Sequence, residues 1–238
     1  MSRCIVVVPT YNEAENLPLL VPAVLAQDPR IELLVVDDDS PDGTGKRADD
    51  LALADPRVHV LHRPRKQGLG PAYREGIARA LELGADWVIQ MDADFSHPPA
   101  MLVTMLAEIE RYDVVSGSRY IDGITVVNWP IERILISYFG NAYVRRVTGL
   151  PITDTTGGFR CMRRDLVERI GIENVRANGY GFQIELNHRC VRAGARVKEI
   201  PFFFVDRRRG TSKLSWQIGF EALWIALRLR IAELLGRP

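Results

Sequence analysis

Long apolar runs and cysteine are both scarce in this chain of 238 residues. The longest stretch without Asp, Glu, Lys, Arg or His, Asn16–Gln27, is far shorter than the ~20 apolar residues of a membrane-spanning helix. The 3 cysteines (Cys4, Cys161 and Cys190) show neither the Cys-x-x-Cys nor the Cys/His spacing of a zinc site. They indicate reduced core residues of a cytosolic protein. Met1–Pro9 enters an apolar run at once, which leaves no room for a signal peptide. We therefore expect a chain that is soluble or lies on a membrane surface.

An excess of either charge is also lacking. The chain has 31 Lys and Arg against 30 Asp and Glu, a formal net charge of +1. This balance does not favour nucleic acid as a partner. Basic residues nevertheless gather at Arg145–Arg146, Arg163–Arg164 and Arg207–Arg209. Such clusters are either solvated faces or binding sites for phosphate groups or an anionic membrane.

Short apolar runs alternate with longer amphipathic stretches in the first half of the chain. Cys4–Val8 is a continuous apolar run, and Ile31–Val36 and Trp87–Met91 are each apolar apart from one polar residue, as in strands that are buried on both faces. Val58–Leu61 and Asp113–Ser116 complete five expected strands. Helices are expected after Asn12, with Thr10 or Asn12 as the N-cap, and over Gly45–Leu53, Pro71–Leu83 and Pro99–Arg111. The alternation predicts an α/β fold with a mainly parallel, Rossmann-like sheet flanked by helices.

The alternation weakens after Arg119. The expected elements there are a loop over Gly123–Trp129, a helix over Ile131–Val147, a strand over Phe159–Met162, a helix from about Phe182, a strand over Val197–Val205 and a long apolar helix over Leu214–Leu235. We predict one main domain with a C-terminal helical extension.

Polar loops follow three of the expected strands, at Pro9–Glu13, Asp37–Asp42 and Asp92–His97. The carboxyl ends of parallel strands meet at one edge of a sheet, where α/β proteins bind ligands. Asp92 and Asp94 flank a single small residue, so their carboxylates can share a side of the backbone and repel unless a cation joins them. Hard divalent ions bind carboxylate and phosphate oxygens. The pattern predicts a metal-assisted site for a phosphorylated substrate, with a solvated turn as the alternative for D-x-D alone.

Four motifs together resemble the inverting GT-A glycosyltransferases of family 2: P-T-Y-N-E, V-V-D-D-D-S-P-D-G-T, Q-M-D-A-D-F-S-H-P-P and G-S-R-Y. Phe204–Lys213 (F-V-D-R-R-R-G-T-S-K) is similar to a V-D-R-x-x-G-x-S-K signature of its polyprenol (dolichol) monophosphate mannose synthases. The resemblance covers almost the whole chain. It implies a GT-A catalytic domain over residues 1–213 and an amphipathic, apolar helix over residues 214–238, in place of several transmembrane helices.

The resemblance implies transfer of mannose from GDP-mannose to a polyprenyl (dolichyl) monophosphate, with inversion and with Mg²⁺ or Mn²⁺. A phosphate acceptor is already ionised at neutral pH and needs no general base. Asp154 is the candidate base if the acceptor is a hydroxyl, and a loop-ordering residue otherwise. The resemblance also implies a peripheral enzyme on the cytoplasmic face of a membrane, with a membrane-anchoring subunit as a candidate partner and no nucleic acid. Ile131–Val147 and Leu214–Leu235 carry aromatic and basic residues that could lie in the membrane interface or pack on the body.

Individual residues receive roles from the same resemblance. Asp92 and Asp94 would bind the metal, with Ser96 in looser contact, and Asp92, Asp94 and Arg119 would be catalytic. Tyr11 offers a flat face for stacking, whereas the alternative is that it packs in the core. Arginines can grip phosphates bidentately. The residues implied for the nucleotide sugar are Pro9, Tyr11, Glu13, Val36, Asp38, Asp92, Ala93, Asp94, Ser96, Arg119, Arg133, Arg207 and Lys213.

Three other functions make different demands on the sequence. The most similar alternative is a family 2 transferase with another donor, such as UDP-glucose, or with a hydroxyl acceptor. If the acceptor is a hydroxyl and Asp154 is its base, Asp154→Asn should be nearly inactive. A dinucleotide oxidoreductase should show G-x-G-x-x-G after the first strand, where this chain has P-T-Y-N-E. A non-catalytic nucleotide-binding subunit could dispense with the carboxylate pair, yet Asp92 and Asp94 are both present.

Overall fold

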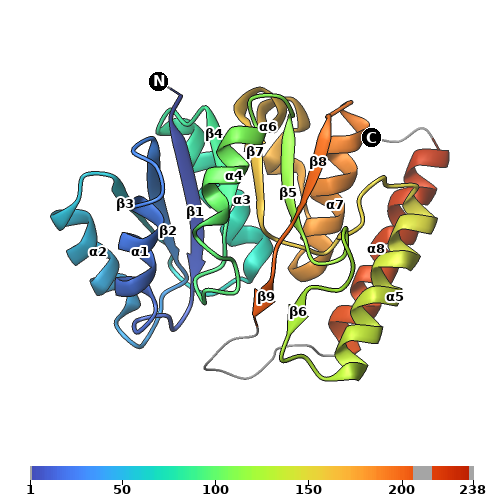
Figure 1. Ribbon diagram of the computed structural model, residues 1–238, viewed down its shortest axis with the longest axis horizontal. Coiled ribbons are helices and arrows are strands. Elements are labelled where there is room, and N and C mark those ends of the chain that lie inside the picture. Colours follow the sequence, from blue (N-terminus) through green and yellow to red (C-terminus); the bar gives the residue numbers. More distant parts are fainter. Residues whose placement is uncertain (1, 206–215, 236–238) are drawn as a thin grey trace.

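The computed structural model describes residues 2–205 and 216–235, with the side chains of residues 2–205 and 223–235. Within these residues, the main sheet has seven strands in the order β3-β2-β1-β4-β7-β5-β8 (Figure 1). Only β7 runs antiparallel to its neighbours among these strands. The strands are β1 (Cys4–Thr10), β2 (Ile31–Asp37), β3 (Val58–His62), β4 (Trp87–Gln90), β5 (Val114–Ser118), β7 (Arg160–Arg163) and β8 (Val197–Pro201). The predicted mainly parallel α/β sheet is confirmed.

Helices cover both faces of this sheet. One face packs against α1 (Leu17–Leu25), α2 (Thr44–Ala54) and α4 (Met101–Glu108). The other packs against α3 (Leu69–Glu82), α6 (Arg164–Ile170) and α7 (Gly179–Arg192), with the short 3₁₀ helix η1 (Ile172–Asn174) beside them. Successive residues of β1 point into alternate cores. This explains why the β1 sequence is apolar without interruption. The three cysteines are buried and unpaired, as expected.

Two further helices lie side by side at the right of Figure 1. They are α5 (Ile131–Thr148) and α8 (Trp216–Leu234). The expected C-terminal extension is thus a helix packed on the body, against α5 and α7. A Cβ on Gly181 of α7 would overlap Ile225 Cδ1, so the glycine permits the close approach of α8. The buried side chains at this contact are Val144, Ala177, Ile184, Ile225, Ala226 and Leu229. Among the described residues, no helix is both long and apolar enough to cross a membrane.

The predicted caps of the first helix were wrong. Thr10 belongs to β1, and its hydroxyl is 3.1 Å from Asp37 Oδ1. Asn12 has a left-handed backbone, with φ of 62°. The helix begins only at Leu17, and Asn16 at its N-cap makes no side-chain capping bond. Thr10 and Asn12 therefore shape the loop after β1 instead of starting the helix.

The predicted single strand Val197–Val205 was also wrong. β8 ends at Pro201, which has no N–H to donate to a neighbouring strand. The chain then leaves the main sheet, and β9 (Phe204–Val205) pairs with β6 (Val126–Val127), inside the stretch that was expected to be a loop. Helix α7 begins at Gly179, earlier than expected, because the Asn178 side chain accepts a hydrogen bond from Gly179 N. Helices α6 and η1 were not predicted from the sequence.

Candidate active site

A pocket of about 130 Å³ lies at the carboxyl ends of β1, β2 and β4, on the lower edge of the sheet in Figure 1. It collects residues from all three polar loops that the sequence analysis singled out. Its lining is Pro9, Thr10, Tyr11, Glu13, Asp38, Lys66, Gly68, Leu69, Ala72, Asp92, Ala93 and Asp94. The topology therefore brings together carboxylates, an aromatic ring and a lysine at the edge where the fold binds ligands.

The acidic loop after β2 mainly organises the pocket. Asp37 accepts hydrogen bonds from the hydroxyls of Thr10 at 3.1 Å and Ser40 at 2.6 Å, which ties β1 to this loop. Asp38 lines the pocket and pairs with the buried guanidinium of Arg63. Arg63 also pairs with Glu75, whose Oε2 lies 2.9 Å from Arg63 Nε. Asp38 is therefore an ordered acceptor in the pocket wall.

Tyr11 is half-buried and presents its ring to the pocket, so the alternative of full core packing does not hold. Lys66 Nζ lies 3.6 Å from the centroid of that ring, a cation–π contact. Sequence reasoning missed Lys66, together with Thr10, Gly68, Leu69 and Ala72. The available signal was the Gln67–Gly70 turn, which follows β3 at the same edge of the sheet.

The two carboxylates of the D-x-D turn are each held by a neighbouring donor. The Tyr73 hydroxyl donates to Asp92 Oδ1 at 2.9 Å, and the Asp92 N–H donates to His97 Nδ1 at 2.9 Å. Asp94 Oδ1 accepts from Ser96 N at 3.1 Å and from Ser96 Oγ at 2.6 Å. Ser96 is buried and does not line the pocket. Its observed role is to orient Asp94, while direct metal contact remains a prediction.

Burial keeps the two partners of Asp92 uncharged at neutral pH. It raises the pKa of Tyr73 well above 10, with a further contribution from the Asp92 charge. It lowers the pKa of His97 below 6.5 despite the nearby Asp92 and Asp94. The neutral imidazole accepts at Nδ1, so the hydrogen-bond pattern assigns its proton to Nε2, which lies 4.0 Å from Asp92 Oδ2.

A buried ion pair stands close to this turn. Arg119 Nε donates to Asp154 Oδ2 and Nη2 donates to Oδ1, both at 2.6 Å. Burial opposes the ionisation of Asp154, but the Arg119 charge outweighs it and holds the Asp154 pKa below its ordinary 3.8. Asp154 is fully buried, with both oxygens occupied. It is therefore not arranged to take a proton from an acceptor hydroxyl, as a general base must be.

An aromatic cluster connects the arginines to the D-x-D turn. The Trp129 ring centroid lies 3.8 Å from Arg133 Cζ and 5.6 Å from Arg119 Cζ. The centroid of the Phe204 ring lies 5.3 Å from that of Trp129 and 6.2 Å from that of His97. Arg119 and Arg133 thus both stand against the Trp129 ring, and we refer to this pair as the basic subsite. They do not line the pocket itself.

Comparison with known proteins assigns the family. The sequence profile described as "Glycosyl transferase family 2" matches residues 5–171. The chain belongs to this family. It is 43% identical to an undecaprenyl-phosphate mannosyltransferase of Micrococcus luteus over 96% of this chain and 99% of that protein. It is 47% identical to a polyprenol monophosphomannose synthase of Mycolicibacterium smegmatis over 90% of this chain and 82% of that one.

Solved structures confirm the predicted GT-A-like fold of this family 2 glycosyltransferase. Glucosyl-3-phosphoglycerate synthase from Mycobacterium tuberculosis, in complex with Mn²⁺, UDP-glucose and phosphoglyceric acid, superposes with a TM-score of 0.67. The match covers 100% of this chain and 81% of that chain at 18% identity. At this identity the likeness concerns the fold alone.

The implied site residues of the family 2 chain divide by their position in the structure. Val36 is fully buried, so only its backbone could meet a nucleotide. Ser96, Arg119 and Arg133 also lie outside the pocket lining, and Arg207 and Lys213 lie outside the described residues. The implied residues that do line the pocket are Pro9, Tyr11, Glu13, Asp38, Asp92, Ala93 and Asp94.

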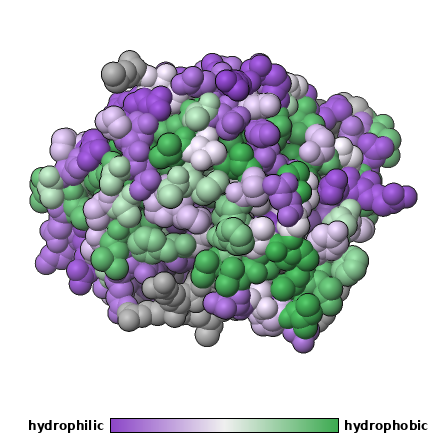
Figure 2. Space-filling model, viewed as in Figure 1, coloured by the Kyte–Doolittle hydropathy of each residue, from purple (hydrophilic) through white to green (hydrophobic). Residues whose placement is uncertain are grey.

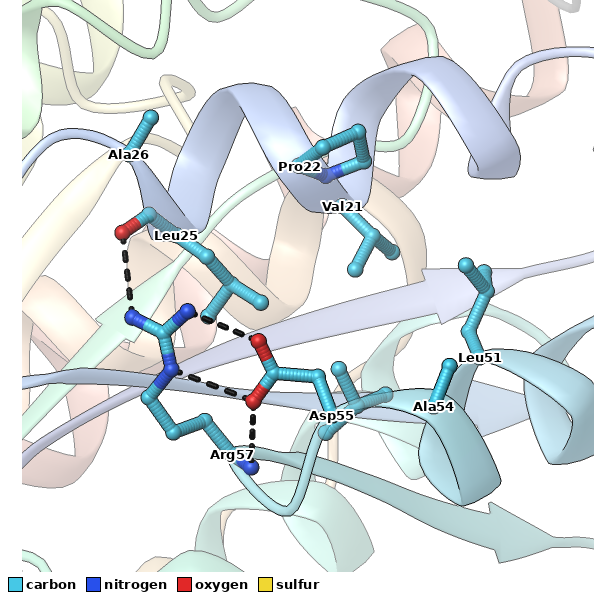
Figure 3. Close-up of a pocket in the computed structure, with 9 residues that line it drawn as sticks. Val21, Pro22, Leu25, Ala26, Leu51, Ala54, Asp55 and Arg57 are labelled. Atoms are coloured by element: carbon cyan, nitrogen blue, oxygen red, sulfur yellow. Dashed lines mark hydrogen bonds and ion pairs between the residues drawn. The ribbon is translucent and has the colours of Figure 1, made fainter.

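A second pocket of about 290 Å³ lies between α1 and α2, near the start of β3. Figure 3 shows its mainly apolar lining, with Val21, Leu25 and Leu51 among the labelled side chains. Arg57 donates to the Leu25 carbonyl at 3.2 Å and to Asp55 at 2.7 Å, so both charges of the lining are paired. This pocket is at the amino-end edge of the strands and has no carboxylate pair, so it lacks the features of the candidate active site.

Proposed function

We propose that this chain transfers mannose from GDP-mannose to a polyprenyl (dolichyl) monophosphate with inversion, and releases GDP. The observation that carries the proposal is the pairing of two unlike subsites, with no carboxylate placed as a general base among their described residues. One is a pocket with a carboxylate pair. The other is a basic subsite in which the buried carboxylate of Asp154 is locked to Arg119. The names of the two relatives support mannosyl transfer to a polyprenyl phosphate.

The donor would bind in the pocket. Tyr11 offers a face for the base once the flexible Lys66 side chain moves off the ring. Asp38, fixed by Arg63, would accept from the base or a ribose hydroxyl. Pro9 and Glu13 complete this wall, and Val36 would contribute only backbone atoms.

The donor set at the D-x-D turn fits a hard divalent cation, Mg²⁺ or Mn²⁺. Asp92 and Asp94 supply carboxylate oxygens in the pocket. No cluster of three or more His, Cys, Asp or Glu ligands occurs in the described part of the chain. The remaining positions would therefore fall to donor phosphate oxygens and water, as is usual for Mg²⁺. When bound, the ion would act as a Lewis acid that stabilises the departing nucleoside diphosphate.

The acceptor phosphate would bind at the basic subsite. Arg119 Nε and Nη2 donate to Asp154. The third nitrogen of the guanidinium, Nη1, makes no hydrogen bond to any described residue. Arg119 and Arg133 would orient the phosphate, and Arg207 and Lys213 would join them. A phosphate oxygen that is already ionised attacks the anomeric carbon in line with the leaving group, so an α-linked donor yields a β-linked product. Asp154 would act by holding Arg119 in place.

The membrane would lie at the same edge of the molecule. Figure 2 shows hydrophobic side chains gathered at the lower right, where Figure 1 draws β6 and the start of α5. Ile131 is 63% exposed and Phe139 is 64% exposed. Arg145 and Arg146 add positive charge at the other end of α5, in its last turn, and basic residues on an exposed apolar helix favour an anionic interface. We propose peripheral attachment to the cytoplasmic face, with a membrane-anchoring subunit as a further partner. Flotation with anionic vesicles would test this attachment.

We also propose a division of the chain: residues 1–213 would form the catalytic domain and residues 214–238 its helical extension.

Transfer of radiolabelled mannose from GDP-mannose to a short polyprenyl phosphate in detergent tests the function. We expect organic-extractable label with Mg²⁺ or Mn²⁺, none with EDTA, and none from Asp94→Ala. Asp50→Ala on the exposed side of α2 is the matched control and should retain activity. Activity with UDP-glucose alone would refute the donor, and equal activity with an unphosphorylated polyprenol would refute the acceptor.

A further inference from the structure

We infer that Tyr73 is a positioning residue for the metal site, whose hydroxyl holds the Asp92 carboxylate in the orientation that ligates the divalent cation. The inference deepens the proposed function, because it rests on the cation bound at Asp92 and Asp94. Tyr73 belongs to α3 and lies far from the D-x-D motif in the sequence.

Asp92 is held at two of its atoms. The Tyr73 hydroxyl donates to Oδ1 at 2.9 Å, and His97 Nδ1 accepts from the backbone N–H at 2.9 Å. The Asp92 side chain is still 30% exposed. Among the described residues, no donor bonds to its Oδ2. One oxygen is thus fixed by the protein, while the other remains available to a ligand.

The Tyr73 ring has no room to move. It is fully buried and stacks on the buried ring of Phe182, with centroids 6.1 Å apart and an interplanar angle of 12°. One turn further along α3, a Cβ on Gly76 would stand 2.6 Å from Val7 and 2.7 Å from Val36. The glycine lets α3 lie directly on the sheet. The phenol oxygen therefore has a fixed position relative to β4 and the turn that follows it.

The second carboxylate is oriented in a similar way, which supports this role. Ser96 bonds Asp94 Oδ1 through both its N–H and its hydroxyl. Each carboxylate of the pair thus has one oxygen held by a donor of this chain. Partners that orient metal ligands in this way are typically worth 10- to 100-fold in metal affinity.

Titration of the full-length protein with Mn²⁺, followed by electron paramagnetic resonance, tests the inference without donor or acceptor. Tyr73→Phe keeps the buried ring and removes only the hydroxyl, and we expect its dissociation constant for Mn²⁺ to rise roughly 10-fold. Tyr112→Phe, just before β5 and at the opposite edge of the sheet, is the matched control and should not change it. In an Asp92→Asn background, Tyr73→Phe should cause little further loss, because both changes act on the same ligand.

Four results would overturn the inference. Two concern affinity: an unchanged Mn²⁺ affinity in Tyr73→Phe, and an equal loss with and without Asp92. The others are a Tyr73→Phe variant that is unfolded in the assay, which would make the hydroxyl a folding contact, and the absence of any Mn²⁺ binding by the wild type. A wild type that binds Mn²⁺ in a Tyr73-dependent way but transfers no mannose would refute the proposed function and support the positioning role.

Discussion

Asp154→Asn should destabilise the fold strongly, because it leaves a buried arginine without its counter-charge. The side chains of Arg119 and Asp154 are 7% and 0% exposed, so water cannot replace the lost partner. Asparagine keeps one carbonyl acceptor but cannot receive the two charge-assisted bonds to Arg119. Removing one member of such a pair typically costs about 3–5 kcal/mol, and we expect the free energy of unfolding to fall by that amount.

Urea denaturation at pH 7 would measure this loss. Asp165→Asn is the matched control, since Asp165 pairs with Arg163 at 3.3 Å on the surface, with side chains 63% and 37% exposed. Exposed pairs contribute at most about 1 kcal/mol. Replacing the whole pair, as in Arg119→Met with Asp154→Leu, should cost less than Asp154→Asn alone, because no buried charge is left over.

The pH dependence distinguishes a structural carboxylate from a general base. The pKa of Asp154 is lowered in the folded state, so its stabilisation is complete above the unfolded value of about 3.9 and is lost as the pH falls through the folded value. The stability difference between wild type and Asp154→Asn should therefore be constant from about pH 5 to 8 and shrink only below about pH 4. A difference below about 1 kcal/mol at pH 7, or one that changes near neutrality as for a base tuned to the working pH, would refute this account.

Two further predictions concern packing and the membrane face. Gly76→Ala should lower the free energy of unfolding by about 1–3 kcal/mol, because the added Cβ would overlap Val7 and Val36. Gly140→Ala in α5, where a Cβ would meet nothing within 4 Å, should raise it by about 0.5–1 kcal/mol. Urea unfolding of both variants measures the two changes, and changes of the same sign would contradict the prediction. Phe139→Asp should reduce flotation with anionic vesicles. Leu53→Asp should leave it intact, because Leu53 is even more exposed (87% against 64%) but lies on α2. Equal flotation of the two variants would argue against α5 as the contact.

Much of the fold could be predicted because its strands are buried on both faces. Continuous apolar runs such as Cys4–Val8 have no other stable location than the middle of a covered sheet. Prediction failed where tertiary contacts outweighed the local pattern. Val197–Val205 looks like one strand, but the chain turns away after Pro201 and β9 pairs with β6.

The sequence by itself determined the family, the edge of the sheet that bears the site, and the identity of the D-x-D carboxylates, because motifs and parallel-strand topology are properties of residue order. Only the tertiary structure decided what the charged residues do there. Asp154 and Arg119 are 35 residues apart in the chain, and nothing local distinguishes a carboxylate that takes protons from one locked to a guanidinium. The difference lies in burial and in the partner at each oxygen, and both arise only when distant segments pack together. For the same reason Tyr73, an ordinary helix residue in sequence, becomes a partner of Asp92 only in the folded protein.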